Sequence, residues 1–229
     1  MSFSEHAWQS VAPWFGAICD HPFVTGLADG TLDDDVFARY LLDDSHYLDR
    51  YARVLATLAA RAPDIEGIAL LAGSAAGAVA AERELHREFL APRGLDPDAD
   101  AVPGATPTCR AYTGSLESAA HGPFNIALAA VLPCFRVYAE VGRHVMSQRR
   151  GGTHPYAAWI DAYAAPEFAE AVRTMEAYVD GVASAGMTSD RTGMLDAYTL
   201  STRYEWMFWD AAWSGQEWPT VMTGTSAPR

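Results

Sequence analysis

The sequence contains no lysine, so all 16 of its basic residues are arginines. This absence excludes a lysine Schiff base, a pyridoxal phosphate anchor and a Walker-type phosphate loop. Acidic residues number 29, which gives a formal net charge of −13 at pH 7. Such an acidic chain is a poor partner for nucleic acid or for an anionic membrane.

Cysteine is also scarce. Cys19, Cys109 and Cys134 are widely spaced and form no C-x-x-C pair, which argues against a zinc ribbon or a redox dithiol. No run approaches the roughly 18 uninterrupted apolar residues of a membrane span. The N-terminal segment carries Glu5 and His6 and no basic stretch, unlike a signal peptide. We therefore expect a cytoplasmic protein with free thiols.

Strand signals are nearly absent, because β-branched runs with a period of two do not occur. Residues 92–107 are rich in proline and are expected to form the one long loop, and residues 219–229 a loose tail. Thr31 is the predicted cap of a long helix. No repeat or linker divides the chain, so we expect a single all-α domain over 1–229. Helices are predicted over 5–18, 22–28, 31–60, 64–90, 108–120, 124–147, 155–164, 166–185 and 190–213.

The helix predicted over 31–60 carries an acidic residue, Asp44, inside an apolar stripe. A carboxylate there needs a partner or a raised pKa. Two interpretations stay open: a structural aspartate bonded to a tyrosine, an arginine or a helix end, and a functional acid. Asp43 points elsewhere, toward solvent or a helix interface. Steps of three and four place on one face Phe37, Tyr40, Leu41, Asp44, Tyr47, Leu48, Tyr51 and Leu55.

The helix predicted over 124–147 places Cys134 and Tyr138 on one face, four residues apart. Pro133 lies inside this helix, where it removes a backbone hydrogen bond and should kink the chain beside the thiol. Cys134 is either a small core residue or a nucleophile.

In the last predicted helix, Glu205 lies on the inward stripe. Apolar walls raise the pKa of a carboxyl group and suit it to acid–base chemistry near neutral pH. The alternative is an ion pair with Arg203 or another arginine. Together, Cys134, Asp44 and Glu205 suggest attack on a ring or carbonyl carbon in an aromatic-lined pocket. The aromatic neighbours of Glu205 are Tyr204, Trp206, Phe208 and Trp209.

A competing metal site would use two pairs four residues apart, Glu82 with His86 and Glu140 with His144. The ferritin-like pattern instead spaces Glu and His three apart and adds a further Glu from each remaining helix. A pair spaced by four is more often a helix-stabilising contact. We therefore expect no metal and no other cofactor.

Several motifs follow one another along nearly the whole chain, and in this ordered set it resembles the TenA family, the thiaminase II enzymes. The motifs are H-P-F-V at 21–24, G-T-L at 30–32, F-x-x-Y-L-x-x-D-x-x-Y-L-x-x-Y-A-R at 37–53, E-x-x-x-H at 82–86, Tyr112, P-C-x-x-x-Y at 133–138, P-Y-x-x-W-I-x-x-Y at 155–163 and E-x-x-F-W at 205–209.

This resemblance implies a haem-oxygenase-like helical bundle, usually a homotetramer, that binds neither haem nor metal. It implies hydrolysis of thiamin, or of 4-amino-5-aminomethyl-2-methylpyrimidine, to the 5-hydroxymethyl pyrimidine, the latter in thiamin salvage. Cys134 places the chain with the cysteine-bearing branch. Asp43 and Ser45 depart from the Gln and the aromatic residue common in the family, which leaves the preferred substrate open. The alternatives are a metal-dependent oxidase of the same fold and a non-catalytic pyrimidine- or thiamin-binding regulator.

The resemblance also implies roles for residues. Cys134 would add to the ring carbon next to the one that bears the leaving methylene. Glu205 would exchange a proton with a ring nitrogen, and Asp44 would bond the exocyclic amino group and poise the thiol. The residues expected to line the pocket are Tyr47, Tyr112, Tyr138, Tyr163 and Phe208.

Overall fold

The computed structural model describes residues 1–95, 104–149 and 153–219, and only the backbone of 81, 82, 85, 86, 93, 188 and 189. No strand occurs within these residues, which confirms the all-α prediction. The helices are α1 (Phe3–Ser10), α2 (Ala12–Cys19), α3 (Pro22–Asp29), α4 (Asp34–Arg61), α5 (Ile65–Leu90), a 3₁₀ turn (Ala91–Arg93), α6 (Pro107–Ala120), α7 (Phe124–Gln148), α8 (Ala157–Tyr163), α9 (Pro166–Ala185) and α10 (Thr188–Ser214).

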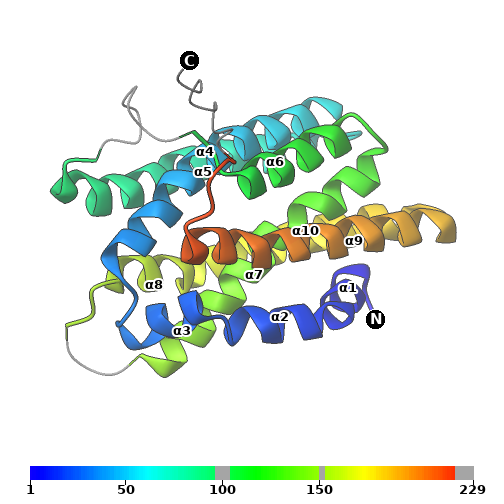
Figure 1. Cartoon of the computed structure of the whole chain (residues 1–229). Coiled ribbons are helices and arrows are strands. Elements are labelled where there is room, and N and C mark those ends of the chain that lie inside the picture. The colour runs from blue at the N-terminus through cyan, green and yellow to red at the C-terminus, as the bar shows by residue number, and fades with distance from the viewer. Residues whose placement is uncertain (96–103, 150–152, 220–229) are drawn as a thin grey trace, which may run out of the picture.

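The long helices form two groups that meet at the middle of the molecule (Figure 1). Helix α4 packs along α5 and against α6, while α7 packs against α10, α8, α9 and α3. Helix α10 also contacts α4 and α6, and α4 contacts α7 directly. The helices that carry Asp44, Cys134 and Glu205 are therefore neighbours.

A cluster of buried aromatic side chains joins these helices. The ring of Tyr40 on α4 stacks on that of Trp209 on α10, with centroids 5.1 Å apart. The Tyr40 hydroxyl donates to the Tyr138 hydroxyl at 3.2 Å and accepts from Nε1 of Trp159 at 3.3 Å. Large aromatic rings supply much of the apolar area that such a core buries. The first of these hydrogen bonds also orients the Tyr138 hydroxyl.

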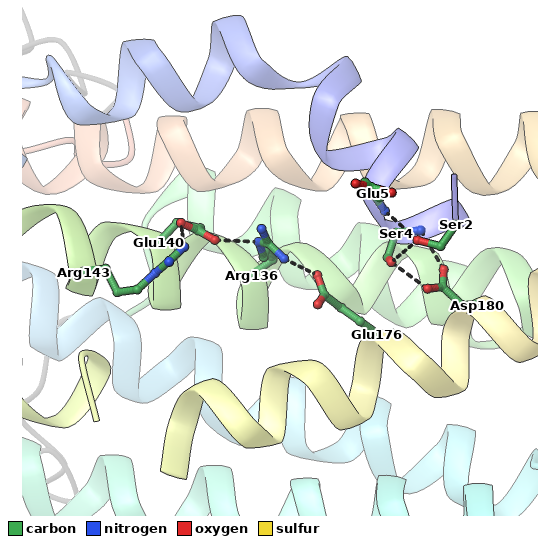
Figure 2. Close-up of polar contacts among 8 residues, drawn as sticks. All are labelled: Ser2, Ser4, Glu5, Arg136, Glu140, Arg143, Glu176 and Asp180. Atoms are coloured by element: carbon green, nitrogen blue, oxygen red, sulfur yellow. Dashed lines mark hydrogen bonds and ion pairs between the residues drawn. The ribbon is translucent and has the colours of Figure 1, made fainter. Parts of the chain in front are cut away.

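Polar contacts hold α1 and α9 against the rest of the structure, as Figure 2 shows. The backbone N–H and hydroxyl of Ser4 donate to the Asp180 carboxylate at 2.7 and 2.8 Å. Arg136 on α7 forms an ion pair with Glu140 at 2.8 Å and donates a hydrogen bond to Glu176 on α9 at 2.7 Å. Both glutamates are largely shielded from solvent, so this bridge is screened less than a surface ion pair. It ties the middle of α9 to α7.

Two expectations about the N-terminal third are wrong. The single helix predicted over 5–18 is two helices that meet at Val11. Pro13 lies in the first turn of α2, where its ring and missing N–H do not allow one helix to continue through it. The long helix begins after Asp33, whose carboxylate accepts from the N–H groups of its first turn, and not after Thr31.

Thr31 is instead part of the preceding turn. Its N–H and hydroxyl donate to Asp29 at 3.0 and 2.6 Å. The expected loop over 92–107 is described only at its two ends, by the 3₁₀ turn and by the start of α6. Its centre, 96–103, and the tail beyond residue 219 lie outside the described residues.

Helix α7 is long and apolar enough to cross a membrane, with a mean hydropathy of 1.4 over its most apolar window. In the structure 61% of that window is buried inside the protein. The apolar character of α7 is accounted for by its contacts with α10, α8 and α9.

Candidate active site

A cavity of about 610 Å³ lies between α4, α5, α7, α8 and α9. Cavities of roughly 300–1,000 Å³ are typical of small-molecule sites. Its lining residues come from helices far apart in the sequence: Asp44, Tyr47, Leu48, Tyr51, Ala69, Leu70, Gly73, Ser74, Gly77, Ala78, Cys134, Phe135, Tyr138, Ala162, Tyr163, Ala165, Glu167, Phe168 and Ala171. Five predicted site residues are among them, so the structure brings together side chains that the sequence predicts on separate helices.

Cys134 is the thiol that faces this cavity. It is half-buried on α7, directly after Pro133, which lies inside the helix. In the turn before it, the Val131 carbonyl accepts the Tyr51 hydroxyl at 2.8 Å. Neither of the other two cysteines lines the cavity, and burial raises the pKa of both. A thiol with access to a cavity is open to substrate, whereas a packed thiol is inert.

Asp44 and Tyr47 supply polar groups to the cavity from α4. Asp44 is only 3% exposed and Tyr47 only 4%. The Tyr47 hydroxyl is buried and has no hydrogen-bond partner among the described residues. Since an unpaired buried hydroxyl is costly, it is suited to bonding a bound ligand.

Glu205 lies on α10 and is 2% exposed. The Tyr112 hydroxyl donates to its carboxyl group at 2.6 Å. Burial is the main cause that raises the pKa of Glu205, the bond from Tyr112 opposes it, the nearby charge of Asp44 adds to it, and the resulting pKa is about 8. The predicted raised pKa is thus confirmed, and Glu205 is a protonated acid near neutral pH. The alternative ion pair with Arg203 is absent, because that guanidinium lies 5.5 Å from the ring of Trp14.

Three predicted residues are not in the cavity wall. Tyr112 and Phe208, expected to line the pocket, lie behind Tyr47, with ring centroids 5.0 and 5.7 Å from its ring. Glu205 lies in the same layer, bonded to Tyr112. An apolar stripe in the sequence shows which face of a helix is buried. It does not show which side chains of that face line a cavity and which pack behind the lining.

The cavity wall also contains residues of α4, α5 and α9 that were not predicted as site residues. On α4, Tyr51 follows Tyr47 by four residues on the same stripe, so its place in the wall could have been predicted. Gly73 and Gly77, also spaced by four, leave room for the cavity on α5. Glu167 and Phe168 follow a proline at the start of α9, and no periodic signal singled them out.

Asp43 faces a helix interface, one of its two predicted positions. Its carboxylate accepts the N–H and the hydroxyl of Thr106, the cap of α6, at 2.9 and 2.6 Å. Burial raises its pKa, which these hydrogen bonds oppose. Asp43 thus fastens α6, the helix that carries Tyr112, to α4.

The metal-site alternative has little support in the described part of the chain. There, no three His, Cys, Asp or Glu side chains are grouped as a metal would need. Glu140 is held by two arginines, and His144 pairs with Gln148 at 3.0 Å. The side chains of Glu82 and His86 lie outside the described residues.

Solved structures define the class of this protein. A TenA homologue from P. horikoshii superimposes with a TM-score of 0.85 at 25% identity, over 94% of this chain and 100% of that one. A Shewanella denitrificans domain with a heme oxygenase-like fold superimposes with a TM-score of 0.74 at 14% identity, over 94% of this chain and 93% of that one. The fold is therefore the haem-oxygenase-like helical bundle, with a thiol and a carboxylate in an aromatic-lined cavity.

The family follows from sequence comparison. Residues 8–215 match the model of the TENA/THI-4/PQQC family. The aminopyrimidine aminohydrolase of Bacillus subtilis is 34% identical over 220 residues, which cover 95% of this chain and 92% of that protein. The thiamine biosynthesis multifunctional protein ThiED of Corynebacterium efficiens is 35% identical over 92% of this chain but only 28% of its own length. The chain belongs to the TENA/THI-4/PQQC family.

Proposed function

We propose that this protein is an aminopyrimidine aminohydrolase of the thiaminase II type. It hydrolyses 4-amino-5-aminomethyl-2-methylpyrimidine, thiamin or both to 4-amino-5-hydroxymethyl-2-methylpyrimidine, in thiamin salvage or degradation. The observation that carries this proposal is one cavity that Cys134 and Asp44 both line. The similarity to the Bacillus subtilis aminopyrimidine aminohydrolase supports the substrate class.

The reaction proceeds through a covalent adduct. The Cys134 thiolate adds to the ring carbon next to the one bearing the methylene, while a ring nitrogen takes a proton. The ring electrons then expel the leaving group from the methylene. Water adds at the methylene and loses a proton, and the thiolate leaves as the ring nitrogen gives its proton back. Such an adduct divides one difficult displacement into easier steps.

The buried carboxyl groups have different roles. Glu205, protonated near pH 7, supplies the proton for the ring nitrogen and takes it back. Asp44 accepts a hydrogen bond from the exocyclic amino group. Tyr47, Tyr138 and Tyr163 contact the ring, and Tyr47 also offers its unpartnered hydroxyl.

We propose, further, that residues 1–229 act as one domain and that the protein is a cytoplasmic homotetramer. No nucleic acid, membrane or cofactor is needed for the reaction. The formal net charge of −13 supports the absence of anionic partners. Analytical ultracentrifugation tests the assembly, since a monomer would contradict it.

Mass spectrometry of the product tests the reaction. Purified protein receives either thiamin or the aminomethyl pyrimidine, and the hydroxymethyl pyrimidine is quantified. We expect product from at least one substrate, its loss in Cys134→Ala, and its retention in the control Cys19→Ala, whose thiol lies outside the cavity. Absence of product from both substrates would overturn the proposed function.

A further inference from the structure

The charged side chains that line the described cavity are all acidic. Asp44 is buried in its wall, and Glu167 is exposed at the start of α9, while no arginine or histidine is among the lining residues. The Glu167 carboxylate has no ion-pair or hydrogen-bond partner within the described part of the chain. Its charge is therefore not neutralised by a neighbouring side chain.

A continuous aromatic wall leads from the thiol to Glu167. Tyr138 lies one turn after Cys134 on α7, and its ring is 4.9 Å from that of Tyr163. The Tyr163 ring meets Phe168 edge-on at 5.3 Å, and Glu167 is the next residue along α9. A substrate whose ring lies at Cys134 and whose leaving group follows this wall brings that group toward Glu167.

We propose that Glu167 is a specificity-determining residue that selects substrates by the charge of the leaving group. It favours pyrimidines whose leaving group is a cation, such as a primary ammonium or an aromatic cation, over those with a neutral or phosphorylated group. Among the described residues, the cavity lining has no cationic side chain to compensate the desolvation of a phosphate. This inference rests on the proposed function for its choice of ligands.

Glu167 also lies in the first turn of α9, where a negative charge stabilises the helix N-terminus. This structural role gives a different expectation. If substitution of Glu167 only destabilises the helix, the affinity for cationic and neutral ligands falls alike. If Glu167 selects by charge, only the affinity for the cation falls.

Two pyrimidines of nearly equal size separate the two roles. The 5-aminomethyl pyrimidine carries a protonated amine at pH 7, and the 5-hydroxymethyl pyrimidine is neutral. Calorimetry measures the Kd of each in a Cys134→Ala background, which does not hydrolyse the aminomethyl pyrimidine, with Glu167 unchanged or replaced as Glu167→Gln or Glu167→Arg, at low and high salt. The control is Glu170→Gln, one turn further on the same helix, whose carboxylate pairs with Arg173 away from the cavity.

We expect the preference for the cation to fall about 3- to 5-fold in Glu167→Gln and about 10-fold in Glu167→Arg, with the neutral ligand unchanged. The salt dependence of cation binding should weaken in both variants and persist in the control. For turnover of the aminomethyl pyrimidine, Glu167→Gln should raise KM and leave kcat within about twofold.

Equal weakening of both ligands, or an unchanged ratio in both variants, would overturn the inference. A wild-type protein that binds both pyrimidines but converts no substrate refutes the proposed function, while the ratio of Kd values still decides the role of Glu167. Failure to bind either pyrimidine refutes both.

Discussion

The buried carboxyl group of Glu205 should make the stability of the fold depend on pH in a defined direction. Its pKa is raised from 4.5 to about 8 in the folded protein. Between these values the native state holds a proton that the unfolded state has released. The free energy of unfolding therefore falls as pH rises, by up to about 1.4 kcal/mol per pH unit.

The substitution Glu205→Gln removes this titration and keeps the size of the side chain. Between pH 5.5 and 7.5 the wild type should lose about 2–3 kcal/mol more than the variant, because most of this range lies between the unfolded and the folded pKa of Glu205. Other titrating groups, such as Asp43 and His21, are present in both proteins and cancel in the difference. The contribution is complete below about pH 4.5 and is lost as pH passes 8.

Urea denaturation at pH 5.5, 6.5 and 7.5 measures this difference. A control, Glu84→Gln, changes a carboxylate that is 79% exposed and should leave the slope unaltered. Equal slopes for the wild type and Glu205→Gln would mean that Glu205 ionises in the folded protein as it does in the unfolded chain, which contradicts a raised pKa.

Three further substitutions test individual contacts. Tyr112→Phe removes the hydrogen bond that lowers the pKa of Glu205, so the basic limb of the pH–rate profile should move up by about 1 unit; an unmoved limb would contradict the assignment. Asp43→Ala leaves the N–H and hydroxyl of Thr106 without their acceptor and should cost about 1–3 kcal/mol in urea denaturation, and a negligible cost would show that α6 is held in another way. Gly142→Ala places a Cβ 2.7 Å from a backbone carbon of α8 and should destabilise the protein by about 1–3 kcal/mol, whereas the usual gain of alanine in a helix would contradict that close approach.

Most of the helical fold could be predicted from periodicity, because amphipathic stripes mark each long helix. The failures lie where a single residue outweighs the pattern. Pro13 divides the first predicted helix, and Asp33 takes the capping position assigned to Thr31. In both places the local chemistry of a helix start decides the boundary.

The candidate site was only partly predictable. Stripe position indicated that Asp44, Cys134 and Glu205 face inward, and all three do so. Stripe position does not distinguish residues of the cavity wall from residues packed behind it, such as Tyr112, because that distinction depends on how the helices pack. Glu167 carried no sequence signal, since an acidic residue at a helix start is common on any surface.

The substitution Cys134→Ser tests whether Cys134 is the nucleophile of an aminopyrimidine hydrolase. Turnover of the aminomethyl pyrimidine and the Kd of the hydroxymethyl product are measured on the same preparation, with Cys19→Ser as control. The account predicts a loss of kcat of about 100-fold or more, with the Kd within about threefold of the wild type. Unchanged turnover, with or without a loss of binding, would contradict it.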